Sequence, residues 1–164
     1  MENEMQTVAR HLGKAPVDLE AIFDDLGIDY REAAIRTGES AWIERIGNRF
    51  NVVVNLNEPE VRRRFSAAHE LAHYLLHRDL MQVDGDRMNR HEDWLYDAPG
   101  QNPEAPFTRQ HEIQANRLAA QIVMPAKLIR EKFSECQDIT QLAADFRVSK
   151  LAMEIRLKTL GLAG

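Results

Sequence analysis

The sequence predicts an α+β domain, and three stretches indicate this class. Residues 41–55 contain two strand-like segments around Gly47-Asn48, a dipeptide suited to a tight hairpin turn. Residues 65–77 repeat apolar side chains at the spacing of a helix, and residues 139–161 predict two further helices joined by a short turn. We therefore expect a small, mostly antiparallel sheet, a central helix and a C-terminal helical bundle.

The remaining elements follow from the same kinds of pattern. Residues 19–26 place apolar side chains at i, i+3, i+4 and i+7, and Gly27 follows as a stop signal. Residues 28–35 are expected to be extended. Further helices are expected over residues 4–12, 111–123 and 126–133.

Length and composition predict a single cytoplasmic domain. The chain has 164 residues, of which 44% are hydrophobic and 29% charged, enough to form one core over residues 1–164. Within it we expect a sheet and metal-site core at 1–124 and a helical subdomain at 125–164. The net charge of −5 argues against broad nucleic-acid coating, and the single Cys136 fits a reducing compartment. No apolar run is long enough to span a membrane, and the polar N-terminus is not a signal peptide.

The predicted helix at 65–77 carries a His-Glu-x-x-His motif at His69, Glu70 and His73. Residues four apart lie on one helix face with Cβ atoms about 5–6 Å apart, so both imidazoles can reach one divalent metal ion. Glu70 lies next round the helix, where it can touch a water on the metal without being a ligand. This arrangement is typical of a metal-assisted hydrolase. We expect the stretch 57–60 to begin the helix, with Asn57 as N-cap and a capping-box glutamate.

A zinc enzyme needs a third protein ligand, and the predicted helix at 111–123 offers one. Glu112 can supply a carboxylate, and Asn116, one turn later, can form a supporting hydrogen bond. His77 and His111 compete for the ligand role by spacing alone. Because three ligands at i, i+4 and i+8 would rise about 12 Å along the axis, we expect His77 to pack or to contact substrate. His111 is a candidate for polarising the substrate carbonyl, and Tyr74 is a further candidate for contacting substrate.

Two segments beside the motif lead to hypotheses about substrate access. Residues 78–110 are rich in turn signals, and we interpret them as a mobile flap near the site. The sheet edge is expected within residues 41–55, where an extended peptide could add as a further strand. The two C-terminal helices resemble a helix-turn-helix, but Lys150, Arg156 and Lys158 are too few to favour DNA reading over simple packing.

Four ordered motifs carry a resemblance to a known family. They are Arg64-Phe65-Ser66-Ala67-Ala68-His69-Glu70-Leu71-Ala72-His73-Tyr74-Leu75-Leu76-His77, Glu112-x-x-Ala115-Asn116-x-x-Ala119-Ala120-x-x-x-Met124-Pro125, Leu142-Ala143-x-x-Phe146-x-Val148-Ser149 and Arg156-Leu157-x-x-Leu160-Gly161. Together they resemble the ImmA/IrrE family of metallopeptidases over most of the chain. Two features depart from the family pattern, because Gln114 stands where relatives often have a second Glu and the 78–110 segment is long and acidic.

The resemblance implies a zincin-like fold with zinc at His69, His73 and Glu112, although manganese or iron could replace zinc. It also implies that Glu70 is catalytic and that the substrate is a helix-turn-helix repressor, as in stress-response or mobile-element and phage control. Two other function classes stay open. The chain could be a non-enzymatic regulator that binds a repressor or DNA, with the metal in a structural role, or it could be one component of a toxin–antitoxin pair.

Overall fold

The computed structural model confirms the α+β class for the residues it describes, which are 2–36, 38–81, 88–91 and 107–163. The helices and strands, in chain order, are α1 (Glu4–Ala9), α2 (Leu19–Leu26), β1 (Asp29–Ala33), β2 (Glu39–Ile46), β3 (Arg49–Asn55), α3 (Glu60–His77), the 3₁₀ turn η1 (Arg78–Leu80), β4 (Met88–His91), α5 (Arg109–Val123), α6 (Ala126–Glu135), α7 (Ile139–Phe146) and α8 (Lys150–Thr159).

The four strands form one sheet in the order β1-β3-β2-β4. The pairs β2–β3 and β2–β4 are antiparallel and β1–β3 is parallel, which confirms the expected mostly antiparallel sheet. The predicted hairpin turn joins β2 to β3, and Gly47 there has φ 60°, a conformation that glycine adopts without steric cost. Ile43 lies opposite Val52 in the hairpin, and both side chains are fully buried.

The predicted position of the sheet edge is wrong. Residues 41–55 form β2 and β3, which are the two interior strands, and the edges are β1 and β4. The sequence analysis did not predict β4, because residues 88–91 fall in the stretch interpreted as a flap. Turn residues are frequent in that stretch, and a short strand gives only a weak pattern. Its pairing with β2 is a long-range interaction that local patterns do not reveal. Of the rest of the predicted flap, residues 82–87 and 92–106 lie outside the described part of the chain.

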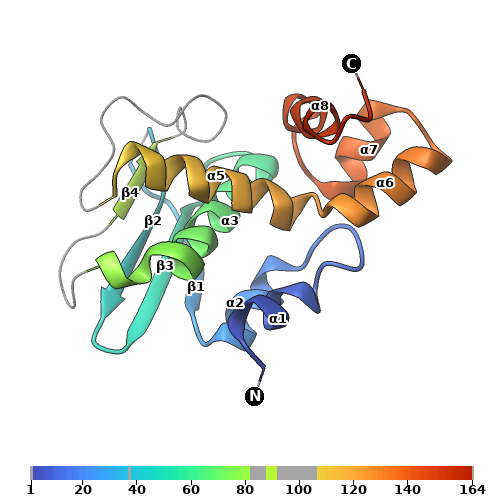
Figure 1. The fold of residues 1–164 in the computed structure, drawn as a ribbon. Helices are drawn as coiled ribbons and strands as arrows, with labels where there is room; N and C mark the ends of the chain where they lie inside the picture. Colours follow the sequence, from blue (N-terminus) through green and yellow to red (C-terminus); the bar gives the residue numbers. More distant parts are fainter. Residues whose placement is uncertain (1, 37, 82–87, 92–106, 164) are drawn as a thin grey trace.

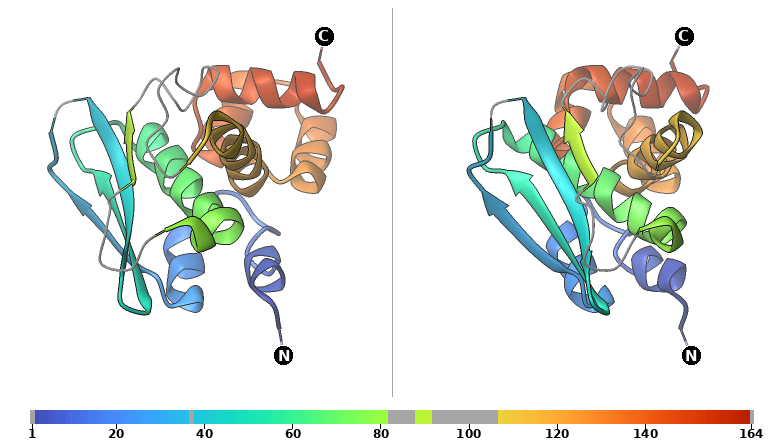
Figure 2. Two further views of the ribbon diagram at one scale, coloured as in Figure 1. Left: turned by 60° about the vertical axis from the view of Figure 1, so that its left-hand side comes forward. Right: turned by 90° about the vertical axis from the view of Figure 1, so that its left-hand side faces the viewer.

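Helix α3 lies between the sheet and α5, as Figures 1 and 2 show. It contacts β2 and β3 on one side and α5 on the other. Every residue from 65 to 74 is buried, as expected of a helix covered on two sides. The predicted N-cap is wrong, because α3 begins at Glu60 after Pro59, with no side-chain cap. Proline is tolerated at a helix start because its missing N–H would have no intrahelical partner there.

The remaining helices form two groups, one to the right of the sheet in Figure 1 and one toward the bottom of that view. α6, α7 and α8 lie together at the C-terminal end of α5, and α1 and α2 pack on each other near the N-terminus. The predicted caps are confirmed at two helix ends, since Ser149 accepts a hydrogen bond from Ala152 N and Gly27 ends α2 with φ 73°. In the described part of the chain, no helix combines the length and apolar character needed to cross a membrane.

The double burial of α3 predicts which of its leucines stabilise the fold. Leu71 is completely buried and Leu76 is 49% exposed on the same helix. Leu71→Ala should therefore lower the free energy of unfolding by about 2–5 kcal/mol, because it leaves a cavity in the core. Leu76→Ala should change it by no more than about 0.5 kcal/mol. Urea denaturation of both variants tests this, and equal destabilisation would contradict the placement of α3.

Candidate metal centre

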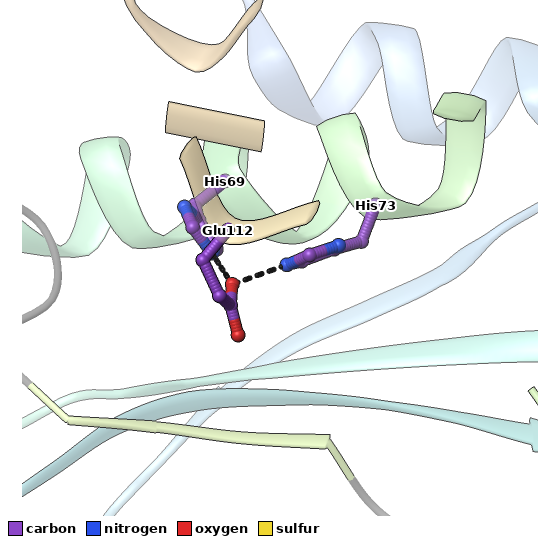
Figure 3. A group of neighbouring side chains, drawn as sticks. All are labelled: His69, His73 and Glu112. Carbon is purple, nitrogen blue, oxygen red and sulfur yellow. Dashed lines mark hydrogen bonds and ion pairs between the residues drawn. The ribbon is translucent and has the colours of Figure 1, made fainter. Parts of the chain in front are cut away.

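Three side chains from two helices converge on one buried point. His69 and His73 project from α3, and Glu112 comes from α5, which faces it (Figure 3). Glu112 Oε1 lies 3.0 Å from His69 Nε2 and 2.7 Å from His73 Nε2. One ligand atom from each residue lies within 4.8 Å of the other two, and all three side chains have no exposed surface.

The local sequence explains why Glu112 occupies this position. Thr108 begins α5 by accepting a hydrogen bond from His111 N at 3.3 Å, and His111 Nδ1 accepts one from Thr108 N at 3.0 Å. These bonds form a capping box that places Glu112 in the first turn. A carboxylate near a helix N-terminus is stabilised in its ionised form, which is the form that binds a metal ion.

Both helices contain several buried alanines, namely Ala67, Ala68 and Ala72 on α3 and Ala115 and Ala119 on α5. Helices α3 and α5 are in contact, and the distance between packed helices depends on the size of the side chains at their contact.

Hydrogen bonds support the outer side of each imidazole. His69 Nδ1 lies 2.6 Å from Asn116 Oδ1, the contact expected of a residue that supports a ligand. His73 Nδ1 lies 2.9 Å from His77 Nδ1, and His77 Nε2 lies 2.8 Å from Gln114 Oε1. Burial lowers the pKa of the His77 imidazole, and its hydrogen bond to Gln114 opposes this effect. His77 thus contacts a ligand candidate and does not join the three converging atoms.

The donor set fits a zinc ion. Two imidazole nitrogens and one carboxylate oxygen are the protein ligands of a common class of catalytic zinc sites, in which a fourth position is left for water or substrate. With Asn116 accepting from His69 Nδ1–H, the Nε2 atom of His69 carries a lone pair directed at the same point as the Glu112 carboxylate. A cation at this point would relieve the repulsion between those electron pairs.

Family comparison agrees with this geometry. The model of the IrrE N-terminal-like domain, a peptidase M78 family, matches residues 26–158. The chain belongs to this family. The resemblance to ImmA/IrrE proteins is thereby confirmed, and membership of the IrrE N-terminal-like family indicates a metallopeptidase-type function. No curated protein gives a significant match to the sequence.

The other predicted site residues, Glu70, Tyr74 and His111, are not among the three whose ligand atoms converge. Glu70 follows His69 on α3 and is completely buried. Tyr74 lies away from the three converging atoms, because its hydroxyl donates to Glu4 Oε2 at 2.8 Å and its ring packs edge-on against Phe50. Burial and the hydrogen bond to Glu4 raise the pKa of Tyr74. His111, besides capping α5, lies with its ring centroid 4.6 Å from that of His77.

Sequence reasoning missed two contributors to the centre. Phe107 is buried and stacks on His73 with ring centroids 4.0 Å apart and an interplanar angle of 2°. Gln114 accepts the hydrogen bond of His77. The only signal for Phe107 was an apolar residue directly before the Thr108 cap. Gln114 was noted as a departure from the family pattern, but this gave no indication of its contact with His77.

A separate cavity lies at the other end of α3. It has a volume of about 450 Å³ and is bordered by the first turns of α3, the segment before α2, β1 and Arg147. None of its lining residues is a predicted site residue, so this cavity is not part of the metal centre.

The geometry predicts which side chains zinc binding requires. Glu112→Ala removes a converging ligand atom and should weaken zinc affinity by more than about 100-fold. Losing a side chain that only supports a ligand already lowers metal affinity by about 10–100-fold. His111→Ala should change affinity far less, since its side chain caps α5 and contributes no converging atom. Competition with a chelating dye measures both constants. Tight zinc binding by the Glu112 variant, with loss in the His111 variant, would reassign the ligand.

Proposed function

We propose that this member of the IrrE N-terminal-like family is a zinc-dependent metalloendopeptidase. The observation that carries the proposal is the buried convergence of Glu112, from α5, with His69 and His73, from the helix α3 that also bears Glu70. Family membership supports the same class. A gluzincin-like arrangement, with Glu112 as third ligand, fits the donor set.

In this proposal each residue has a distinct chemical role. His69, His73 and Glu112 would hold the metal, and Asn116 would orient His69. Zinc, when bound, supplies Lewis acidity toward a carbonyl group and toward water. Glu70 is not among the three ligand candidates, so its carboxylate can accept the proton of the attacking water and pass it to the leaving amine. Manganese or iron could occupy the same ligands in the cell.

A protein substrate suits the C-terminal helices better than DNA. Arg156 is only 8% exposed and its Nε donates to Met124 O at 3.0 Å, so it cannot reach a phosphate. The outer face of α8 instead exposes Leu151 and Ile155, at 54% and 47%. Exposed apolar side chains are typical of protein contacts, and the net charge of −5 opposes DNA binding.

The proposed substrate is a helix-turn-helix repressor, as the family resemblance implies. Cleavage of a flexible or helix-terminal segment would separate the DNA-reading domain from the oligomerisation region. Operator occupancy would then fall, because two linked half-site readers bind far better than one. An extended segment of the substrate could add to the sheet only at β1 or β4, since these are its edges.

Glu70→Gln separates an enzyme from a binding protein. The variant should retain one zinc ion per chain, because its ligands are intact, while proteolysis falls by about 10²–10⁴-fold with the loss of proton transfer. Zinc content and cleavage rate are measured on one preparation. Wild-type cleavage by this variant would overturn the role of Glu70. Full regulatory activity in cells without cleavage would favour the binding alternative.

Repressor cleavage should be selective and dependent on the metal. The purified chain with zinc is incubated with the product of the adjacent reading frame, which the proposal expects to be a helix-turn-helix repressor, and should yield one discrete cut that chelator abolishes. Casein serves as the unrelated control and should remain intact. Gel electrophoresis and mass spectrometry locate the cut. Equal digestion of casein, or an intact repressor whose operator binding still changes, would contradict the proposal.

A further inference from the structure

A chain of hydrogen bonds leads from the metal centre to the surface of α5. His73 Nδ1 lies 2.9 Å from His77 Nδ1, and His77 Nε2 lies 2.8 Å from Gln114 Oε1. His73 is completely buried and His77 is 6% exposed, whereas Gln114 is exposed. The outer end of the chain is therefore the carboxamide of Gln114.

The chemistry of the last group decides the direction of every proton in the chain. A carboxamide oxygen can only accept, so His77 Nε2 must carry the hydrogen that it donates to Gln114. A neutral imidazole has one N–H, so His77 Nδ1 is then an acceptor. His73 Nδ1 must donate to it, so a neutral His73 has its lone pair on Nε2. That nitrogen is the one directed at Glu112 and at the predicted metal position.

The opposite direction would prevent metal binding through His73. If Gln114 offered its amide N–H, His77 Nδ1 would donate to His73 Nδ1, and His73 Nε2 would carry the proton. A protonated nitrogen cannot be a ligand. The orientation of Gln114 thus selects between a tautomer of His73 that can bind metal and one that cannot.

We propose that His77 is a positioning residue for His73, and that Gln114 holds His77 in the tautomer that accepts from His73. Phe107 supports the arrangement because it stacks on His73 at 4.0 Å and so opposes rotation of that ring. Asn116 orients His69 through a hydrogen bond to its Nδ1, as His77 and Gln114 together orient His73. The inference deepens the proposed function and rests on its metal site, but it does not depend on proteolysis.

The tautomer of His77 can be observed without substrate. Long-range ¹H–¹⁵N NMR of the histidine-labelled, zinc-loaded chain should show His73 with its proton on Nδ1 and His77 with its proton on Nε2. In His77→Leu the acceptor is lost, so the Nδ1–H of His73 should exchange faster with water. His77→Asn keeps an acceptor near the position of Nδ1 and should restore slow exchange.

Zinc affinity provides a second readout of the same chain. His77→Leu should weaken zinc binding by about 10–100-fold, the usual cost of losing a group that orients a ligand, and His77→Asn should recover most of it. Gln114→Met should act in the same direction, whereas Gln114→Glu keeps an acceptor and should bind zinc like the wild type. Gln121→Met is the matched control, because Gln121 is exposed on the same helix and belongs to none of these contacts.

The outcomes separate this inference from the proposed enzyme activity. A zinc-loaded wild-type chain with the His77 proton on Nδ1 would overturn the inference even if the chain cleaves its substrate. Unchanged zinc affinity in His77→Leu would do the same. If that variant does not fold, the wild-type tautomer and the paired Gln114 variants still decide. A chain with the expected tautomers and affinities that cleaves nothing would overturn the proposed function alone.

Discussion

The packing of α5 against α3 is the contact on which the metal centre depends. A helix with histidines four residues apart supplies two nitrogen donors on one face, and no third residue on that helix can reach the same ion. The third donor, Glu112, lies 43 residues after His69 and reaches the same point only because the two helices pack closely. The capping box of Thr108 sets the start of α5 and so places Glu112 in the first turn of that helix.

Burial makes this centre costly unless its polar groups are satisfied. His69, His73 and Glu112 have no exposed surface, and unpaired polar groups in such a place lower stability by several kcal/mol. The structure meets this constraint with hydrogen bonds from outside the ligand set, through Asn116 to His69 and through His77 to His73. A bound cation would also satisfy the atoms of His69, His73 and Glu112 that face one another. Metal binding at this point would therefore be coupled to folding.

The same architecture limits how a substrate can approach. Within the residues that the structure describes, β2 and β3 are paired on both sides, so an added strand could pair with the sheet at β1 or β4. The cavity at the start of α3 lies apart from the ligands. On the C-terminal side, Arg156 is buried and α8 exposes Leu151 and Ile155. The proposed protein substrate is consistent with these features.

Local sequence patterns were sufficient for much of this description. The helix with His69 and His73, the β2–β3 hairpin at Gly47 and the cap at Ser149 follow from periodicity, turn residues and capping residues. Glu112 and Asn116 were predicted to share a helix face, and the structure places both at the histidines. Helical spacing depends only on residues close together in the chain, so the shared helix face could be predicted without knowing the fold.

Only the tertiary structure decided the features that join distant segments. It showed that β4 pairs with β2, so that the edge expected within residues 41–55 is covered. It also showed that Tyr74 turns toward Glu4, that Phe107 stacks on His73 and that Gln114 ends the hydrogen-bond chain from His73. The physical reason is the same in each case. Strand pairing and side-chain contacts between elements depend on how whole helices and sheets pack. This packing cannot be predicted from the spacing of residues along the chain.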